Sequence, residues 1–425
     1  MSYGRGAALL SALIGVTGLL TYAFHSLAAH ALGRDGYGVI GVLWAIVFLV
    51  ASVIYRPVEQ LLSRTIAERD ARGQPAGSAL RVAATIQLAL AALFVVVALP
   101  LRGTIEDELL SGSSTLYWLM LAAVTFYAAS YFARGFLAGH RRFGLYGGLV
   151  TMESASRVVF GVMLAVGIAD GRNFAALAIA AAPLLSLIVV PWAIGGHVRR
   201  ASATDAGSAR AGEEFRMTHG IGFAGAVLVV MVSEQSILNA GVLIAKVDTG
   251  SDSIAALIFA VLMIARAPLQ LFQAVSTTLL PHLTRLFVKE QGVDGEGGFG
   301  QSVRLTVLAC LGFGAATVIG VLIAGPPAMK LLFGSKFEYD RFGLALVAAG
   351  TGLYLAATTL NQAALARGRA RAAAASWAAS ATFFVTFLLL GEMEEVREVE
   401  VAFIATAGLL SGLLYLVYRR PGLTA

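Results

Sequence analysis

The sequence has little charge and almost no cysteine. Only 13% of its 425 residues are Asp, Glu, Lys or Arg, whereas a soluble domain carries about a quarter. Cys310 is the single cysteine, which excludes a disulfide framework and a thiol-based metal cluster. Glycine-rich phosphate-binding loops and the spacings typical of metal ligands are also missing. We therefore expect no enzyme activity, no cofactor and no metal.

Hydrophobic residues make up 58% of the chain and occur in long blocks. A helix needs about 20 apolar residues to cross roughly 30 Å of hydrocarbon at about 1.5 Å per residue. The pattern predicts an all-α polytopic membrane protein with about twelve transmembrane helices. The expected spans are 7–31, 37–62, 79–101, 115–138, 145–169, 174–196, 218–245, 253–280, 302–325, 342–365, 372–390 and 399–418.

The longest connection, 197–217, divides these spans into six and six. It is rich in Ala, Ser, Gly and mixed charges, which is typical of a flexible linker. We predict an N-terminal bundle over 1–196 and a C-terminal bundle over 218–425. Transporters are often built from two such bundles with the substrate path between them.

The net charge of +6 follows the expected topology. When the loops are assigned alternately to two sides, 20 Lys and Arg residues fall on one side and 8 on the other. Cytoplasmic loops carry the excess of positive charge. We therefore expect both termini in the cytoplasm, a location in a bacterial inner membrane, and no nucleic-acid partner.

Three basic residues remain inside apolar spans: Arg56, Arg157 and Arg266. An arginine that faces lipid costs at least about 2.5–3.5 kcal/mol, so such residues turn toward protein or a water-filled cavity. Glu59 follows Arg56 by three residues and Glu153 precedes Arg157 by four, so each pair shares a helix face. Two interpretations stay open. The pairs brace the bundle, or the arginines line a cavity and bind an anionic group such as phosphate.

Arg266 lies near the middle of its span, with Gln270 and Gln273 on the same helix face. Pro268 removes a backbone donor and favours a bend beside it. Glu234, equally deep in the seventh span, is the candidate counter-charge. We predict that these residues line the substrate cavity, with a buried structural bridge as the alternative.

Other polar residues inside the spans carry a weaker signal. His25 and Glu234 are candidate ion-coupling residues, although a lone intramembrane histidine is more often a packed hydrogen-bonding side chain. Thr358, Asn361 and Gln362 form a polar face on the expected tenth helix.

Four stretches in order resemble the polysaccharide flippases of the multidrug/oligosaccharidyl-lipid/polysaccharide (MOP) exporter superfamily. Residues 32–38, LGRDGYG, are close to the "LGxxxYG" turn of that family. Residues 132–143 resemble its fourth helix and basic turn, and residues 264–283 resemble its eighth helix. Residues 331–337, LLFGSKF, resemble its "LFGxxF" segment.

This resemblance implies a V-shaped pair of six-helix bundles that alternates access to a central cationic cavity. In the lipid II flippase branch, the eighth-helix arginine stands five residues before the proline, where this chain has Met263. Arg266 stands two before it and nearly keeps the helix face. The absence of two extra helices favours the general polysaccharide repeat-unit flippases.

Our leading hypothesis is a flippase for a polyprenyl-diphosphate-linked oligosaccharide in cell-surface polysaccharide biosynthesis. The expected partners are that lipid-linked anionic glycan, membrane lipids, and a glycan polymerase or glycosyltransferases. One alternative is a MATE-type drug or cation antiporter, whose cavity acids would exchange ions. Another is a membrane scaffold that recruits glycan-assembly enzymes without transport.

Overall fold

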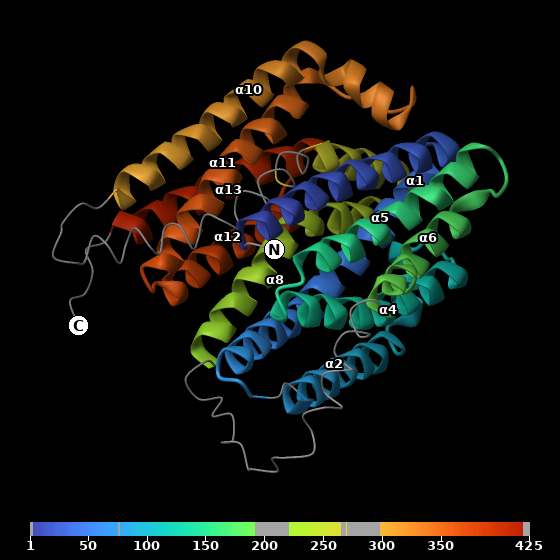
Figure 1. The fold of residues 1–425 in the computed structure, drawn as a ribbon. Helices are drawn as coiled ribbons and strands as arrows, with labels where there is room; N and C mark the ends of the chain where they lie inside the picture. The colour runs from blue at the N-terminus through green and yellow to red at the C-terminus, as the bar shows by residue number, and fades with distance from the viewer. Residues whose placement is uncertain (1–2, 75–76, 192–220, 265–268, 270–297, 420–425) are drawn as a thin grey trace.

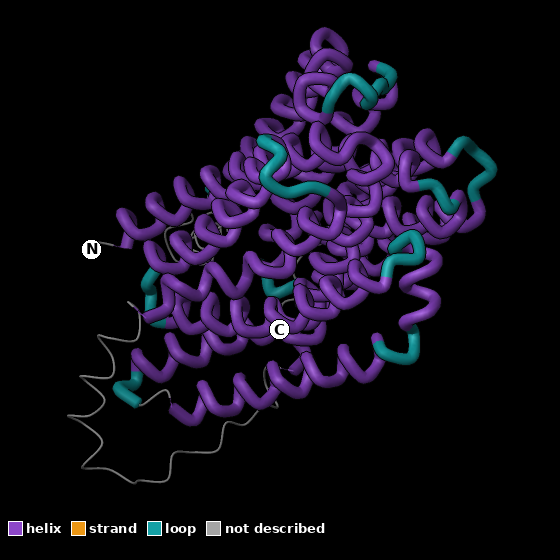
Figure 2. The backbone as a smooth tube through the Cα atoms, turned by 90° about the vertical axis from the view of Figure 1, so that its right-hand side faces the viewer, coloured by secondary structure: helices purple, strands orange, loops and turns teal. Residues whose placement is uncertain are grey.

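The computed structural model of the chain describes residues 3–74, 77–191, 221–264, 269 and 298–419. Helices account for all regular structure in these ranges (Figures 1 and 2). The first half contains α1 (Tyr3–Ala71), α2 (Gly77–Ala98), α3 (Arg102–Thr104), η1 (Ile105–Leu109), α4 (Ser114–Gly139), α5 (Phe143–Ala165), α6 (Gly171–Ser186) and η2 (Leu187–Val189). The second half contains α8 (Ile221–Thr249), α10 (Phe299–Phe333), α11 (Arg341–Ala366), α12 (Ala370–Leu390) and α13 (Glu395–Arg419).

The described residues contain ten helices long and apolar enough to cross a membrane. The first of these segments, Leu9–Asp70, has 62 residues and is long enough for two spans. The shorter helix Asp252–Ile264 begins the expected eighth span, whose remainder lies outside the described residues. The prediction of an all-α polytopic membrane protein is confirmed.

Helices α1 and α10 each contain a residue type that usually interrupts a helix. In α1, the expected loop at 32–36 reduces to one non-helical residue, Gly33, with φ 68° and ψ −176°. Glycine adopts such a positive φ without steric cost, so α1 consists of two helices that meet at a kink at Gly33, in agreement with the two expected spans 7–31 and 37–62. In α10, the helix runs through Pro326 and Pro327 to Phe333. Membrane helices tolerate proline because neighbouring groups satisfy the freed backbone carbonyls.

The helices of each half pack mainly against one another. In the first half, α1 contacts α4, α5 and α6. In the second half, α11 contacts α10 and α13, and α12 contacts α8. The halves meet where α1 contacts α8 and α10 (Figure 1), and one continuous cluster of buried apolar side chains extends through both. The linker 197–217 lies outside the described residues, so the division at this segment stays a prediction.

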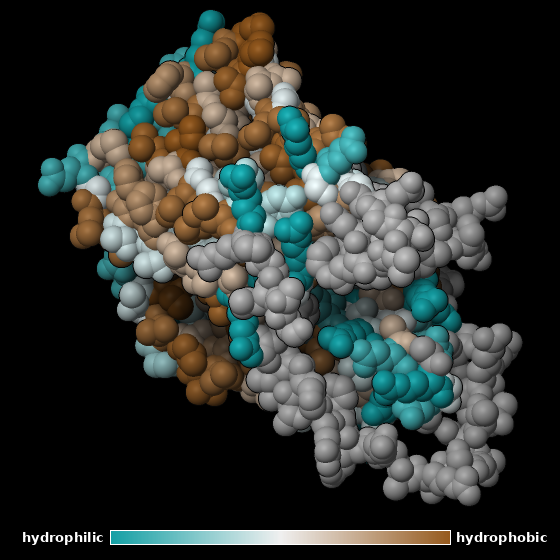
Figure 3. All heavy atoms as spheres, turned by 90° about the vertical axis from the view of Figure 1, so that its left-hand side faces the viewer, coloured by the Kyte–Doolittle hydropathy of each residue, from teal (hydrophilic) through white to brown (hydrophobic). Residues whose placement is uncertain are grey.

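Helices α2 and α10 present apolar side chains outward. Leu88 and Val96 on α2 are 69% and 66% exposed, and Ile323 and Leu331 on α10 are 72% and 77% exposed. Viewed from the left of Figure 1, hydrophobic residues cover much of the upper surface (Figure 3). Large apolar surfaces of this kind are expected where a protein faces lipid.

Candidate functional site

A cavity of about 280 Å³ lies between the two halves. Its wall from the first half is formed by α1, and its wall from the second half by α8, α11, α12 and residue 269. The lining residues are Arg56, Gln60, Ala226, Val227, Val230, Met231, Glu234, Leu238, Leu269, Tyr354, Leu355, Thr358, Asn361, Gln362, Leu365, Ala370 and Trp377. This largely apolar lining with a few polar groups is typical of a small-molecule site.

Arg56 and Glu234 are the two charged residues of this lining, and they lie beside each other. The Nη1 atom of Arg56 on α1 lies 3.9 Å from Oε2 of Glu234 on α8. Their side chains are 39% and 25% exposed. This long, partly open ion pair leaves both groups accessible to a ligand, and it joins the two halves of the molecule at the cavity.

The pairing within α1 differs from the pairing that the sequence suggests. The sequence places Glu59 beside Arg56, whereas the structure places Glu234 there. Glu59 instead accepts a hydrogen bond from the hydroxyl of Tyr146 at 3.0 Å and lies within electrostatic reach of Arg134 and Arg56. Sequence spacing describes only contacts within one helix, so a partner from another helix is not visible in it.

A second charged cluster, formed by Arg134, Glu153 and Arg157, is buried within the first half. Arg157 Nη2 on α5 donates to Glu153 Oε1 at 2.9 Å, which confirms the expected pair. Arg134 on α4 donates to Glu153 Oε2, and the Tyr127 hydroxyl donates to Oε1 at 2.7 Å. Because this contact places Arg134 within the bundle, Arg134 no longer belongs to the 20 basic residues that we counted on one side of the membrane.

Aromatic rings hold the Arg157 guanidinium in place. Its Cζ atom lies 5.0 Å from the ring centre of Trp44 and 5.7 Å from that of Phe48, within the range of cation–π attraction. Because the Arg157 side chain is only 4% exposed, its position indicates a bracing role within the bundle.

His25 lies in an aromatic environment. It is fully buried, with its ring centroid 4.4 Å from that of Trp44 and 5.1 Å from that of Phe259. Its Nδ1 atom is 3.3 Å from the hydroxyl of Tyr37. The structure therefore places His25 at a packed contact between α1 and the helix Asp252–Ile264, away from the cavity lining.

Arg266, Gln270 and Gln273 lie outside the described residues. Their assignment to the cavity, and the pairing of Arg266 with Glu234, therefore stay predictions. Leu269, which is described, does line the cavity.

The two halves close tightly at the end of the molecule that carries Asp252. The Ser111 hydroxyl, between η1 and α4, lies 2.7 Å and 2.9 Å from the two carboxylate oxygens of Asp252. Lys246 Nζ on α8 lies 2.7 Å from Asp252 Oδ1 and donates to Ser111 Oγ at 3.1 Å. We call Ser111, Lys246 and Asp252 the latch. A Cβ on Gly38 would stand 1.8 Å from the Asp252 carbonyl oxygen, so only glycine permits this approach of α1.

An aromatic cluster packs behind the latch. The Tyr37 ring from the first half lies 5.9 Å from the rings of Phe259 and Phe333 and 5.7 Å from that of Phe337. Arg34 Nε also donates to the Ser253 carbonyl oxygen at 3.1 Å. Apolar and polar contacts together therefore seal this end of the interface between the halves.

The loop at 334–340 is fixed at the same end. Lys330 Nζ donates to Glu338 Oε1 at 2.8 Å, and the Tyr339 hydroxyl donates to Glu400 on α13. Burial, together with the neighbouring Glu400 carboxylate, raises the pKa of Tyr339, so this hydroxyl keeps its proton and remains a donor.

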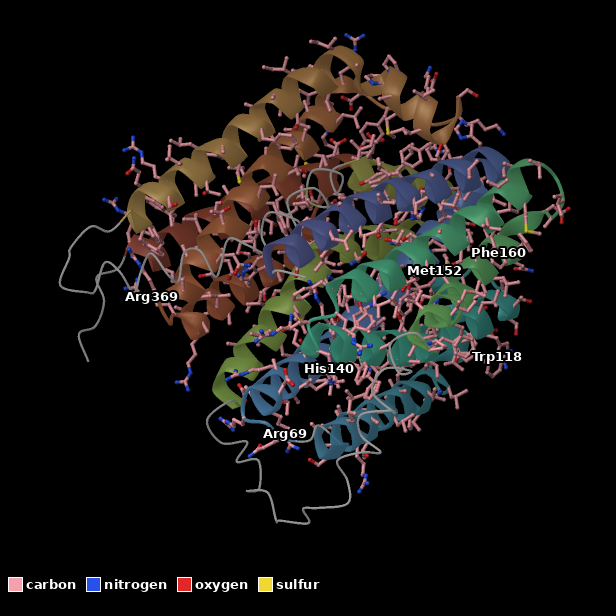
Figure 4. The ribbon with its side chains drawn as sticks, viewed as in Figure 1. Arg69, Trp118, His140, Met152, Phe160 and Arg369 are labelled. Atoms are coloured by element: carbon pink, nitrogen blue, oxygen red, sulfur yellow. The ribbon has the colours of Figure 1, made fainter. Side chains whose placement is uncertain are left out.

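The cavity lies toward the opposite end from the latch. Glu234 and Lys246 both lie on α8 and are 12 residues apart, or about 18 Å along the helix. The cavity is bordered by Ala370, where α12 begins after α11 has ended. In Figure 4, Arg69 and Arg369 lie toward the left end of the helices and Trp118 toward the right end.

Sequence reasoning identified Arg56, Glu234 and the polar face of α11, but it missed two groups. Ser111 could not be identified from the sequence, because it stands beside Gly112 in a short polar turn of ordinary composition. Trp377 was not identified from the sequence. Within the described ranges, no group of three or more His, Cys, Asp or Glu side chains is arranged to hold a metal ion.

No family model matches the sequence, and no curated protein matches it either. Solved structures do match. A mutant of the Vibrio cholerae MATE transporter VcmN is 16% identical over 98% of this chain and 97% of its own, with a TM-score of 0.66. An inward-facing multidrug resistance MATE family transporter of the MOP superfamily is 12% identical over 97% of both chains, with a TM-score of 0.71.

An outward-facing multidrug resistance MATE family transporter of that superfamily also matches. It is 14% identical over 99% of this chain and 96% of its own, with a TM-score of 0.65. Identities this low establish the fold alone. The chain therefore has the fold of the MATE transporters of the MOP superfamily.

Proposed function

We propose that this chain is a membrane transporter that works by alternating access. The observation that carries the proposal is a cavity between the halves whose opposite end is sealed. Arg56 and Glu234 contribute one charge from each half to that cavity, while Ser111 and Asp252 join the halves at the sealed end. Rocking of one half against the other would break one set of contacts and form another.

The distribution of charge supports an inward-facing state. Once Arg134 is placed inside the first half, 19 basic residues remain on the side of the termini and 8 on the other, which favours a cytoplasmic location for the termini. The latch then lies on the outer side and the cavity toward the cytoplasm. The higher TM-score of the inward-facing relative agrees with this proposal.

Within this class, we propose a flippase for a lipid-linked anionic head group. Three acids, Glu59, Glu153 and Glu234, lie inside the described spans near Arg56, Arg134 and Arg157. Each of these acids contacts an arginine or a tyrosine. Arg56 has the most exposed side chain of these three arginines, and its planar guanidinium suits phosphate oxygens. A diphosphate held at Arg56, with its polyprenyl tail in the bilayer, would place the charged part of the lipid in this cavity.

A drug or cation antiporter is the second candidate, and the comparisons favour it over the flippase. Two of the matched structures are of multidrug resistance transporters. Glu234, which is 25% exposed to the cavity, would then hold a cationic substrate or a coupling ion.

The experiment uses the purified full chain in proteoliposomes. It measures the flipping of a fluorescent polyprenyl-diphosphate-linked oligosaccharide and, separately, ethidium efflux driven by a proton or sodium gradient. We expect wild-type protein to flip the lipid and Arg56→Gln to slow flipping by about 10-fold or more, because the charge-assisted contact to phosphate is lost. Arg56→Lys should keep part of the rate.

Arg64→Gln is the matched control, since Arg64 is 65% exposed and pairs only with Glu68 four residues away. Gradient-driven ethidium efflux without lipid flipping would replace the flippase with the antiporter. If the wild-type protein shows neither lipid flipping nor ethidium efflux, the transporter proposal as a whole is contradicted.

A further inference from the structure

The part of the cavity wall formed by α11 contains an asparagine, Asn361, whose amide is held in one orientation. The Trp377 indole Nε1 on α12 donates to Asn361 Oδ1 on α11 at 3.1 Å. An indole N–H is a donor only, so the atom that faces it must be the amide oxygen. The Nδ2 group of Asn361 therefore points the other way.

This Nδ2 group is a hydrogen-bond donor without a partner among the described residues. Asn361 as a whole is 7% exposed. Its unpaired Nδ2 atom nevertheless remains accessible to solvent. Because Asn361 lines the cavity, this donor is open to a ligand there. A largely desolvated donor without a partner is unfavourable, and a bound acceptor would remove that cost.

Packing keeps the tryptophan in position. Trp377 is only 2% exposed, and its ring lies 5.7 Å from that of Tyr354 at an angle of 80°, the edge-to-face arrangement that aromatic pairs prefer. Since the indole cannot easily turn, the amide that it holds is preorganised. Trp377 thus acts on a ligand through Asn361.

The surroundings indicate which acceptor fits. The hydroxyl of Thr358, one turn earlier on α11, donates to the Leu355 carbonyl oxygen at 2.8 Å. The remaining neighbours of Asn361 in the lining are mainly apolar, and the charged lining residues, Arg56 and Glu234, belong to α1 and α8. A neutral donor in such a place suits an uncharged oxygen, because an anion would lose its hydration without a counter-charge.

We propose that Asn361, oriented by Trp377, is a specificity-determining residue that binds an uncharged oxygen of the transported molecule, a hydroxyl or acetamido oxygen of a sugar. This inference rests on the proposed flippase function and adds a second subsite to it. Arg56 on α1 takes the charged part of the head group, and Asn361 on α11 takes the neutral part.

The test compares two lipids that differ only in the neutral part. Binding to the full chain in nanodiscs is measured for polyprenyl diphosphate that carries one N-acetylhexosamine and for polyprenyl diphosphate without sugar. We expect Asn361→Leu to weaken binding of the sugar-bearing lipid by about 3- to 10-fold, the loss expected for one hydrogen bond. Binding of the sugar-free lipid should change less than about twofold.

Trp377→Phe tests the positioning role, because it keeps a ring and removes the N–H. We expect about a two- to threefold loss for the sugar-bearing lipid alone, since the freed amide can flip. Adding Trp377→Phe to Asn361→Leu should then cost nothing further for that lipid, because both changes act on one contact. Thr359→Val is the control: its hydroxyl donates to Leu355 within the helix and faces Cys310 rather than the cavity.

The outcomes separate the two proposals. If wild-type protein binds neither lipid, the flippase proposal fails and this inference fails with it. If wild-type protein binds both lipids and Asn361→Leu leaves the ratio of the two affinities unchanged, the flippase stands and the inference is overturned. An equal loss for both lipids would likewise overturn it, because it would mean a structural effect.

Discussion

At the scale of single residues, the buried cluster around Glu153 shows which ionic contacts a sequence can predict. The Glu153 and Arg157 pair follows from a spacing of four on one helix, and it is present at 2.9 Å. The contact from Arg134 was not predictable, because Arg134 stands 19 residues earlier on another helix. Only the packing of α4 against α5 brings its guanidinium to Glu153.

This arrangement predicts that Glu153 is essential for stability. Glu153→Gln would leave Arg134 and Arg157 buried without their shared counter-charge, and breaking a buried pair in this way costs about 3–5 kcal/mol. Thermal unfolding of the purified protein in detergent should show a clear decrease in the midpoint.

Glu68→Gln serves as the matched comparison. Glu68 pairs with Arg64 at the same spacing of four, but both side chains are exposed, so the expected loss is below about 0.5 kcal/mol. Equal unfolding midpoints for Glu153→Gln and Glu68→Gln would contradict the bracing role of the cluster.

At the scale of elements, the hydrophobic blocks of the sequence predict nearly every described helix, and the connections were harder to predict. The apolar pattern cannot indicate that the connection at 32–36 is a kink at the single residue Gly33 or that α10 continues through two prolines. Both features depend on neighbouring helices, which supply contacts for a backbone that would otherwise be exposed. The turn before α4 was equally hidden, although it supplies Ser111 to the contact between the halves.

Ser111 has a backbone conformation that supports a functional role in this turn. Its φ is 52°, a left-handed conformation that costs a residue other than glycine roughly 1–3 kcal/mol and is frequent at functional sites. The hydrogen bonds to the Asp252 carboxylate offset this cost. Hydrogen bonds to a charged group contribute about 1.5–3 kcal/mol, so the latch is strong enough to bias an equilibrium between two states.

We therefore predict that Ser111→Ala opens this end of the molecule. Spin labels at Glu108→Cys and Ser335→Cys, two exposed positions in the two halves, report the distance across the sealed end in a Cys310→Ala background. Pulsed electron resonance should show one short distance with Ser111 present and an added population at longer distance in Ser111→Ala.

Thr125→Val is a suitable control for the loss of a hydroxyl, because Thr125 donates only to the Leu121 carbonyl of its own helix. It should leave the distance distribution unchanged. An unchanged distribution in Ser111→Ala as well would mean that the aromatic cluster around Tyr37 seals this end without the latch.

At the scale of the whole molecule, composition and the length of apolar blocks predict the membrane fold, and the solved MATE structures agree with it. The site was only partly predictable. Arg56 and Glu234 were identified because charge inside a hydrophobic span is unusual, but their contact with each other depends on how the two halves meet. Asn361 gave a weaker signal, because a neutral amide is common in membrane helices.

The direction of transport depends on orientation, and the charge count predicts it. A membrane-impermeant maleimide applied to intact cells should label Glu108→Cys and leave Arg72→Cys unlabelled in a Cys310→Ala background. Both positions are exposed, so the difference would report the side of the membrane. Arg72→Cys should become labelled once the cells are permeabilised.

The reverse pattern would place the termini and the cavity outside and the latch in the cytoplasm. An inward-facing cavity that receives a newly made lipid-linked glycan would then be impossible, and the same structure would instead be open to the exterior. The orientation of these two positions is therefore the measurement on which the proposed direction of flipping depends. With 19 basic residues against 8, we expect labelling at Glu108→Cys first.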